Sequence, residues 1–178
     1  HLQLSYAYRI VGDAENALKE IKIAVALSPQ KEGMWIELGS AAWDMGDVQT
    51  ARDAFNKAYA LGPSFPDLAI YAAAGNIAAG DSATANKLLM SAYGTTSVDS
   101  DILLAAYYRM KDWPHLIALL KTRANAPGAP VESWFSLAAA YYTSGDKASA
   151  IRAINTAVQL FPDAASAGAN AIKQIEGK

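Results

Sequence analysis

The chain has no cysteine and only two histidines, His1 and His115, in 178 residues. Disulfides, thiolate nucleophiles and cysteine-based metal sites are therefore excluded, and a two-histidine metal site or a histidine-based triad would need histidines from another chain. His115 follows Trp113 and Pro114, where an exposed residue in the first turn of a helix is a better interpretation than a catalytic one. We predict no catalytic residue, no metal site and no cofactor, so the chain is not expected to be an enzyme.

An excess of charge is also missing. The 15 basic and 17 acidic residues are scattered along the sequence and give a formal net charge of -2. Without a basic stripe to neutralise phosphates, nucleic acid is not an expected partner. No apolar run approaches the roughly 20 residues of a membrane span, so we do not expect this segment to insert into a membrane.

The sequence contains a recurring Gly-Asp pair. It stands at 12–13, 46–47, 80–81 and 145–146, with steps of 34, 34 and 65 residues. Other columns align with it: Leu4, Leu38, Ala72, Leu103 and Leu137; Ala17, Ala51, Ala85 and Ala150; Ala24, Ala58, Ala92 and Ala157; Pro29, Pro63 and Pro162. A unit copied about five times is the simplest explanation, and such a period is typical of solenoids.

Each repeat is predicted to be two helices joined at the Gly-Asp pair. Apolar residues recur at three-to-four spacing, as in Trp35, Leu38 and Ala42. A glycine can take the left-handed conformation that ends a helix, and the aspartate after it can cap the first turn of the next. We expect repeats at about 1–30, 31–64, 65–96, 97–130 and 131–163 and a capping helix at about 164–176. The chain is thus predicted to be one all-α domain, a right-handed α-α superhelix.

The 34-residue period and the second repeat, with Trp35, Leu38, Gly39, Ala51, Phe55, Ala58 and Pro63, resemble the tetratricopeptide repeat family. The fourth repeat departs from the pattern, because Lys111-Asp112 replaces Gly-Asp and Leu104, Leu116 and Arg123 replace small residues. The connection before Asp101 is also short. We expect Trp35, Phe55 and Trp134 to be core residues.

The resemblance implies that the first helix of each hairpin lines a concave groove that binds a protein or peptide. The face concerned predicts these binding residues: Tyr6, Arg9, Ile36, Trp43, Asp44, Asp67, Ile70, Ile77, Asp101, Tyr108, Arg109, Glu132, Phe135 and Tyr142, with Leu2, Ile10, Ser40, Ala74, Ala105 and Ala139 beside them. For Ile36, Ile70 and Ile77, core packing is an equal alternative, whereas the tyrosines and Trp43 favour binding because an amphipathic ring tolerates a half-wet groove. The acidic side chains favour an apolar, weakly basic ligand.

Three functions remain open at this stage. The first is a protein-interaction scaffold that holds a peptide or helix in its groove. The second is the soluble arm of a larger enzyme, such as a bacterial glycosyltransferase or membrane glycan polymerase, and the third is a structural spacer or self-assembly element. Because the sequence starts at His1 within a helical pattern, we interpret it as part of a longer chain. Cytosol, periplasm and tethering to a membrane protein all fit, and a homo-oligomer is compatible with the sequence.

Overall fold

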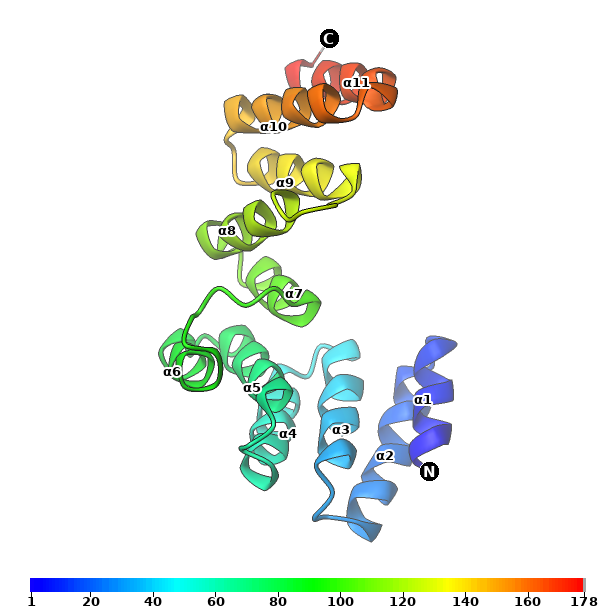
Figure 1. Ribbon diagram of the computed structural model, residues 1–178. Coiled ribbons are helices and arrows are strands. Elements are labelled where there is room, and N and C mark those ends of the chain that lie inside the picture. Colours follow the sequence, from blue (N-terminus) through cyan, green and yellow to red (C-terminus); the bar gives the residue numbers. More distant parts are fainter. Residues whose placement is uncertain (178) are drawn as a thin grey trace. The chain divides into compact units, whose positions relative to one another are not determined.

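The computed structural model describes residues 1–177 and contains two compact units, which are considered separately (Figure 1). Unit 1 is His1–Met110, and unit 2 begins at Lys111. Unit 1 contains α1 (Leu2–Ile10), α2 (Ala14–Leu27), α3 (Glu32–Asp44), α4 (Val48–Leu61), α5 (Pro66–Ala78), α6 (Ser82–Tyr93) and α7 (Asp101–Arg109). Unit 2 contains α8 (Trp113–Ala124), α9 (Val131–Thr143), α10 (Lys147–Leu160), the 3-10 turn η1 (Pro162–Ala164) and α11 (Ala165–Glu176). Residues 1–177 contain no strand, which confirms the all-α prediction.

Helical hairpins are stacked in series within each unit. In unit 1, α1 packs on α2, α3 on α4 and α5 on α6, while α2 also packs on α3 and α4 on α5. In unit 2, α9 packs on α8 and α10, and α11 packs on α10 as the predicted capping helix. The boundary between the units falls inside the fourth predicted repeat, so a single domain over the whole chain stays a prediction.

Each Gly-Asp pair forms the predicted turn, with a left-handed glycine followed by an aspartate that caps the next helix. Gly12, Gly46, Gly80 and Gly145 have φ between 78° and 93°. The aspartate that follows each of them accepts a hydrogen bond from the backbone N–H three residues on, at 2.9 to 3.2 Å. In the irregular fourth repeat, Lys111 takes the same left-handed conformation at φ 55°, and Asp112 caps α8 through the His115 N–H at 3.3 Å. The backbone turn is kept although the glycine is lost.

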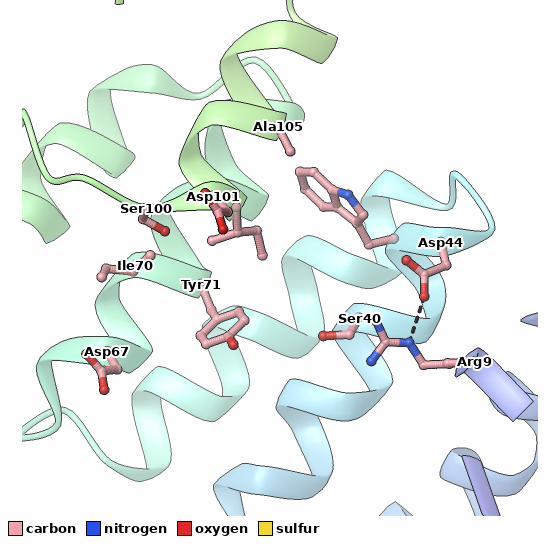
Figure 2. A pocket seen from close by; sticks show the side chains of 11 residues that line it. Arg9, Ser40, Asp44, Asp67, Ile70, Tyr71, Ser100, Asp101 and Ala105 are labelled. Atoms are coloured by element: carbon pink, nitrogen blue, oxygen red, sulfur yellow. Dashed lines mark hydrogen bonds and ion pairs between the residues drawn. The ribbon is translucent and has the colours of Figure 1, made fainter. Parts of the chain in front are cut away.

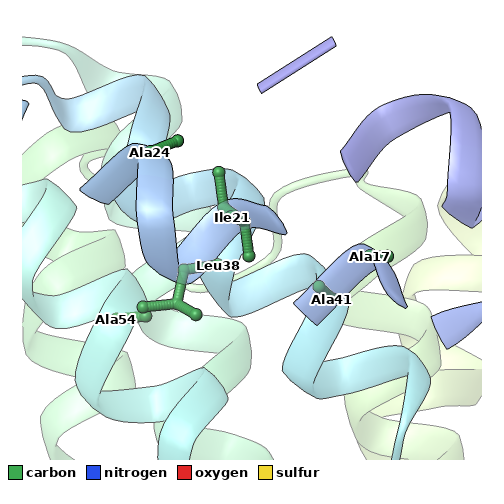
Figure 3. Packing of buried hydrophobic residues seen from close by; sticks show 6 residues of the cluster. All are labelled: Ala17, Ile21, Ala24, Leu38, Ala41 and Ala54. Atoms are coloured by element: carbon green, nitrogen blue, oxygen red, sulfur yellow. The ribbon is translucent and has the colours of Figure 1, made fainter. Parts of the chain in front are cut away.

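The core of the first two hairpins is built mainly of alanine with a few branched side chains. Figure 3 shows Ile21 of α2 and Leu38 of α3 among the alanines that let these helices approach. Ile21 is fully buried and Leu38 is 8% exposed, whereas Leu4, at the equivalent position of α1, is 44% exposed. Small residues at the crossings therefore set the helix spacing, as expected.

Phe55 is the large residue at the centre of unit 1. Its side chain is 0% exposed and lies between Gly39 of α3 and Gly75 of α5, where a Cβ atom would stand 2.3 Å and 3.2 Å from the ring. The prediction that Phe55 is core is confirmed. Trp35 and Trp134 are only half-buried, so neither is a fully buried core residue, but Trp35 packs against the buried cluster that contains Ile21 and Leu38. The indole N–H of Trp35 donates to the carbonyl oxygen of Pro29 at 2.8 Å, so this ring closes a turn at the edge of the core.

Candidate functional site

A pocket of about 620 Å³ opens between the first helices of successive hairpins in unit 1. Figure 2 shows it with its lining side chains, which come from α1, α3, α5, the first turns of α7 and the residue before α7. The lining residues are Arg9, Ser40, Trp43, Asp44, Asp67, Ile70, Tyr71, Ser100, Asp101, Ile102 and Ala105. We call this site the unit 1 pocket. It lies on the helices that the groove prediction names.

The aromatic wall of the pocket, formed by Trp43 and Tyr71, packs against the core residue Phe55. The Phe55 ring lies 6.4 Å from the Trp43 ring and 5.4 Å from the Tyr71 ring, centroid to centroid, and both pairs are tilted. Such pairs add about 0.5–1.5 kcal/mol to the energy of burial. Because Gly39 and Gly75 admit the Phe55 ring between two helices, the two outer rings have a rigid support. Trp43 and Tyr71 are half-buried, so part of each ring faces the pocket.

One end of the pocket is an ion-pair network between α1 and α3. Arg9 donates through Nε to Asp44 at 2.7 Å and through Nη1 to Glu37 at 3.0 Å. Glu37 is 9% exposed and also accepts a hydrogen bond from the Ser5 hydroxyl at 3.2 Å. Burial lowers the pKa of Arg9, but the hydrogen bond to Asp44 and the charge of Glu37 outweigh it and raise the pKa overall. The Arg9 cation is thus permanent and already holds two carboxylates.

The other end of the pocket is acidic. Asp67 of α5 and Asp101 of α7 are exposed, and both line the pocket (Figure 2). The Tyr93 hydroxyl donates to Asp67 at 3.4 Å; desolvation first, and then the charge of Asp67, raises the pKa of Tyr93. With one arginine and three aspartates in the lining, the formal charge of the pocket is -2. The field in the pocket therefore favours cations.

A second arginine contacts the aromatic wall. The Arg109 guanidinium carbon lies 4.7 Å from the centroid of a Trp43 ring, within the range of a cation–π interaction. Arg109 also donates through Nη2 to the Trp43 carbonyl oxygen at 3.4 Å. Its side chain comes from the last residue of α7 and crosses to the end of α3.

The pocket gathers only part of the predicted binding residues. Arg9, Trp43, Asp44, Asp67, Ile70 and Asp101 line it, together with Ser40 and Ala105 from the same predicted face. Ile77 is 1% exposed, so the core alternative holds for it, and Ile36 is half-buried against the cluster around Phe55. Tyr6 and Tyr108 are exposed at 58% and 60% but lie outside this pocket.

The remaining predicted residues belong to unit 2. Phe135 and Tyr142, with Ala139, line a separate cavity of about 270 Å³ between α9, α10 and α11. Glu132 lines another cavity, of about 450 Å³, beside the loop that precedes α9. The two units thus carry separate hollows, and the unit 1 pocket combines aromatic and charged side chains from four helices.

Sequence reasoning missed three lining residues, Tyr71, Ser100 and Ile102. Tyr71 has a usable signal, because it follows Asp67 by four residues and therefore shares its face of α5. Ile102 has a similar signal, because it lies three residues before Ala105 on α7. Ser100 has no such signal, because it lies in the connection before α7.

Metal binding and membrane insertion are two other kinds of function to consider. Within residues 1–177, no group of three or more histidine, cysteine, aspartate or glutamate side chains is arranged to hold a metal ion. Among the helices of the described part of the chain, none has both the length and the hydropathy needed to cross a membrane.

Comparisons with known proteins agree with the helical hairpin architecture. A family model described as "Tetratricopeptide repeat" matches residues 1–172. Among solved structures, TTC0263, a thermophilic TPR protein of Thermus thermophilus, is 17% identical and superposes with a TM-score of 0.63 over 99% of this chain and 97% of its own. MamA from Desulfovibrio magneticus RS-1 is 17% identical, with a TM-score of 0.61 over 90% of this chain and 93% of its own.

A further solved structure, YrrB, is described as a TPR protein with an unusual peptide-binding site. It is 15% identical, with a TM-score of 0.54 over 97% of this chain and 90% of its own. At these identities the likeness establishes the fold alone. No curated protein sequence gave a significant match.

Proposed function

Because the chain belongs to the tetratricopeptide repeat family, we propose that it is a protein-interaction scaffold that binds an apolar, weakly basic peptide segment in the unit 1 pocket. In this function the chain itself carries out no catalytic step. The observation that carries it is the pocket itself, in which side chains from the first helices of three successive hairpins and from α7 meet around one space. YrrB, with the same fold, is described as having a peptide-binding site, and this supports the choice of ligand class.

The pocket has the composition of a peptide site. Trp43 and Tyr71 offer amphipathic rings that are held in place by Phe55, so little entropy is lost when a ligand packs against them. Ile70 and Ile102 add aliphatic surface between the polar ends. Aromatic residues in supported pockets are typical centres of binding energy, and their truncation often costs about 2 kcal/mol or more.

The charges of the pocket select against an acidic ligand. Arg9 is the single cation among the lining residues, and Glu37 and Asp44 already accept its hydrogen bonds. Asp67 and Asp101 stand at the other end, where a lysine or arginine of the ligand would meet two carboxylates. A C-terminal carboxylate would meet repulsion there, so we favour a segment with a basic side chain over a peptide clamped by its terminus.

The experiment selects peptides that bind the protein and then tests whether filling the unit 1 pocket prevents their binding. A library of random twelve-residue peptides would be selected on the protein, and the enriched peptides titrated against wild type and Ala105→Arg. Ala105 is an exposed helix residue that lines the pocket, so a long side chain there fills the space with little effect on folding. Ala26→Arg is the matched control, because Ala26 is exposed on α2, outside the pocket, and receives the same charge.

We expect enriched peptides with aliphatic or aromatic residues beside lysine or arginine, and at least a tenfold loss of affinity in Ala105→Arg. Ala26→Arg should bind like wild type. Asp67→Asn should weaken binding and reduce its salt dependence, whereas Asp53→Asn, on exposed α4 surface, should not. Equal affinities for the two arginine variants would refute the pocket as the binding site.

A further inference from the structure

The contact between Arg109 and Trp43 places a guanidinium against the ring of a residue that lines the unit 1 pocket, although Arg109 itself is not among the lining residues. The acceptor groups around it form a small receptor for a basic side chain. They are the π face of Trp43 at 4.7 Å and the Trp43 carbonyl oxygen at 3.4 Å. That carbonyl lies at the C-terminal end of α3, where the helix dipole also favours a positive charge.

The contact is weakly held. Arg109 is exposed, and its hydrogen bond at 3.4 Å is long compared with the usual 2.7–3.2 Å. The Trp43 carbonyl oxygen already accepts the Gly46 N–H at 3.0 Å, so it does not depend on Arg109 for a partner. Arg109 also sits at the last residue of α7, from which a long side chain can turn to solvent without disturbing the helix.

We propose that Arg109 is an internal competitor, which occupies on Trp43 the position that an arginine or lysine of the bound peptide takes. The inference rests on the proposed function and names the side chain that the pocket recognises. Charge complementarity supports the choice, because Trp43 adjoins lining residues whose formal charge is -2, and Asp44 follows Trp43 directly on α3. With the single positive charge of Arg109 on the ring the formal charge of -2 becomes -1, so a basic ligand side chain that replaces Arg109 takes over the same compensating charge. The arginine of a ligand would replace Arg109 on the Trp43 ring, and the displaced Arg109 side chain would be hydrated by solvent.

A cation–π contact at an exposed site contributes about 0.5–1 kcal/mol, and about 1.4 kcal/mol corresponds to a tenfold change in affinity. Removing the competitor should therefore strengthen the binding of a basic ligand about two- to fivefold. An uncharged ligand of the same shape gains much less, because it makes no cation–π contact with the exposed ring.

The test uses two probes, acetyl-Leu-Arg-Leu-amide and the same peptide with citrulline in place of arginine. Each would be titrated into ¹⁵N-labelled wild type and Arg109→Ala while the Trp43 indole N–H signal is followed by NMR, with the signal assigned from Trp43→Phe. Arg52→Gln is a control for the loss of one positive charge, since Arg52 is on α4 outside the pocket. The titrations would be repeated in about 0.5 M NaCl, which screens exposed charges beyond roughly 4 Å.

We expect Arg109→Ala to bind the arginine probe two- to fivefold more tightly than wild type, with the gain kept in high salt, and Arg52→Gln to match wild type. The citrulline probe should change by less than about 1.5-fold. If Arg109→Ala gives no gain while Asp67→Asn weakens the arginine probe, the competition is wrong and the binding pocket stands. If the arginine probe leaves the Trp43 signal unmoved in every variant, both proposals are wrong.

Discussion

Gly39→Ala tests how closely the helices of unit 1 approach. A Cβ atom at residue 39 would lie 2.3 Å from Cε1 and 2.4 Å from Cδ1 of Phe55, whereas carbon atoms in contact are about 3.5–4.0 Å apart. The ring would have to move by more than about 1 Å. It cannot retreat easily, because its other edge faces Gly75, where a Cβ would be 3.2 Å from Cδ2. Overpacking of this kind costs about 1–3 kcal/mol or more.

Alanine is also a better helix former than glycine, by about 1 kcal/mol, so the two effects oppose each other. With the clash at the upper end of its range, we expect Gly39→Ala to lower the free energy of unfolding by about 2 kcal/mol. The unfolding temperature should fall by about 4–8 °C for a chain of this size. Urea unfolding followed by circular dichroism at about 222 nm and by tryptophan fluorescence gives the measurement.

Gly33→Ala is the control within the same helix. Gly33 lies in α3, and a Cβ there would have no atom within 4 Å, so only the gain in helix propensity remains. This variant should be more stable than wild type by several tenths of a kcal/mol. The double variant Gly39→Ala/Phe55→Leu should lose less than the sum of its single variants, because the smaller side chain relieves the clash. If Gly39→Ala is as stable as Gly33→Ala, the account of the packing around Phe55 is wrong.

Three further predictions concern the turns, the caps and the core. Gly46→Lys should cost about 1–2 kcal/mol in urea unfolding, because φ is 78° and no neighbouring atom hinders the side chain; Lys111→Gly should not destabilise, and a loss there would contradict the strain argument. The pKa values of Asp13, Asp47, Asp81 and Asp146 are lowered by hydrogen bonds from the side chains, and then the backbone, of the residues that they cap. Such groups stabilise the fold at a pH above the unfolded pKa of about 3.9, and this stabilisation is lost as the pH falls through the folded pKa. The urea concentration at the midpoint of unfolding should therefore decrease when the pH is lowered below about 4. The decrease should be smaller in Asp47→Asn, because asparagine still caps the helix but does not titrate. Ile77→Ala should cost about 2–5 kcal/mol and Ile10→Ala, at a 69% exposed site, less than about 0.5 kcal/mol; similar losses would mean that the two faces are misassigned.

The helical hairpins follow from the sequence because their signals are local. Each Gly-Asp pair combines a left-handed residue with a cap, and the chain needs no distant contact to form that turn. The alanine columns likewise predict where helices cross. At residue 111 a lysine replaces the glycine, yet the left-handed turn is kept. A rule based on residue type alone therefore underestimates how closely the turn of the fourth repeat follows the others.

The candidate site was only partly predictable, because it depends on how neighbouring helices are rotated. The helical period places Asp67 and Ile70 on one face, and both line the unit 1 pocket. The same period places Ile77 on this face, but Ile77 is buried because every residue in the second half of α5, from 72 to 78, is buried. The pairing of Arg109 with Trp43 spans 66 residues and joins two helices that no sequence pattern connects.

Chemical shift mapping with a selected basic peptide tests the central claim most directly. Backbone and indole signals of the ¹⁵N-labelled protein would be followed as the peptide is added. We expect the largest changes at Trp43, at Ile70 and Tyr71 of α5 and at the first turn of α7 around Asp101, which border the unit 1 pocket. Changes confined to α2, α4 and α6, or to the cavity of unit 2 around Phe135 and Tyr142, would contradict it.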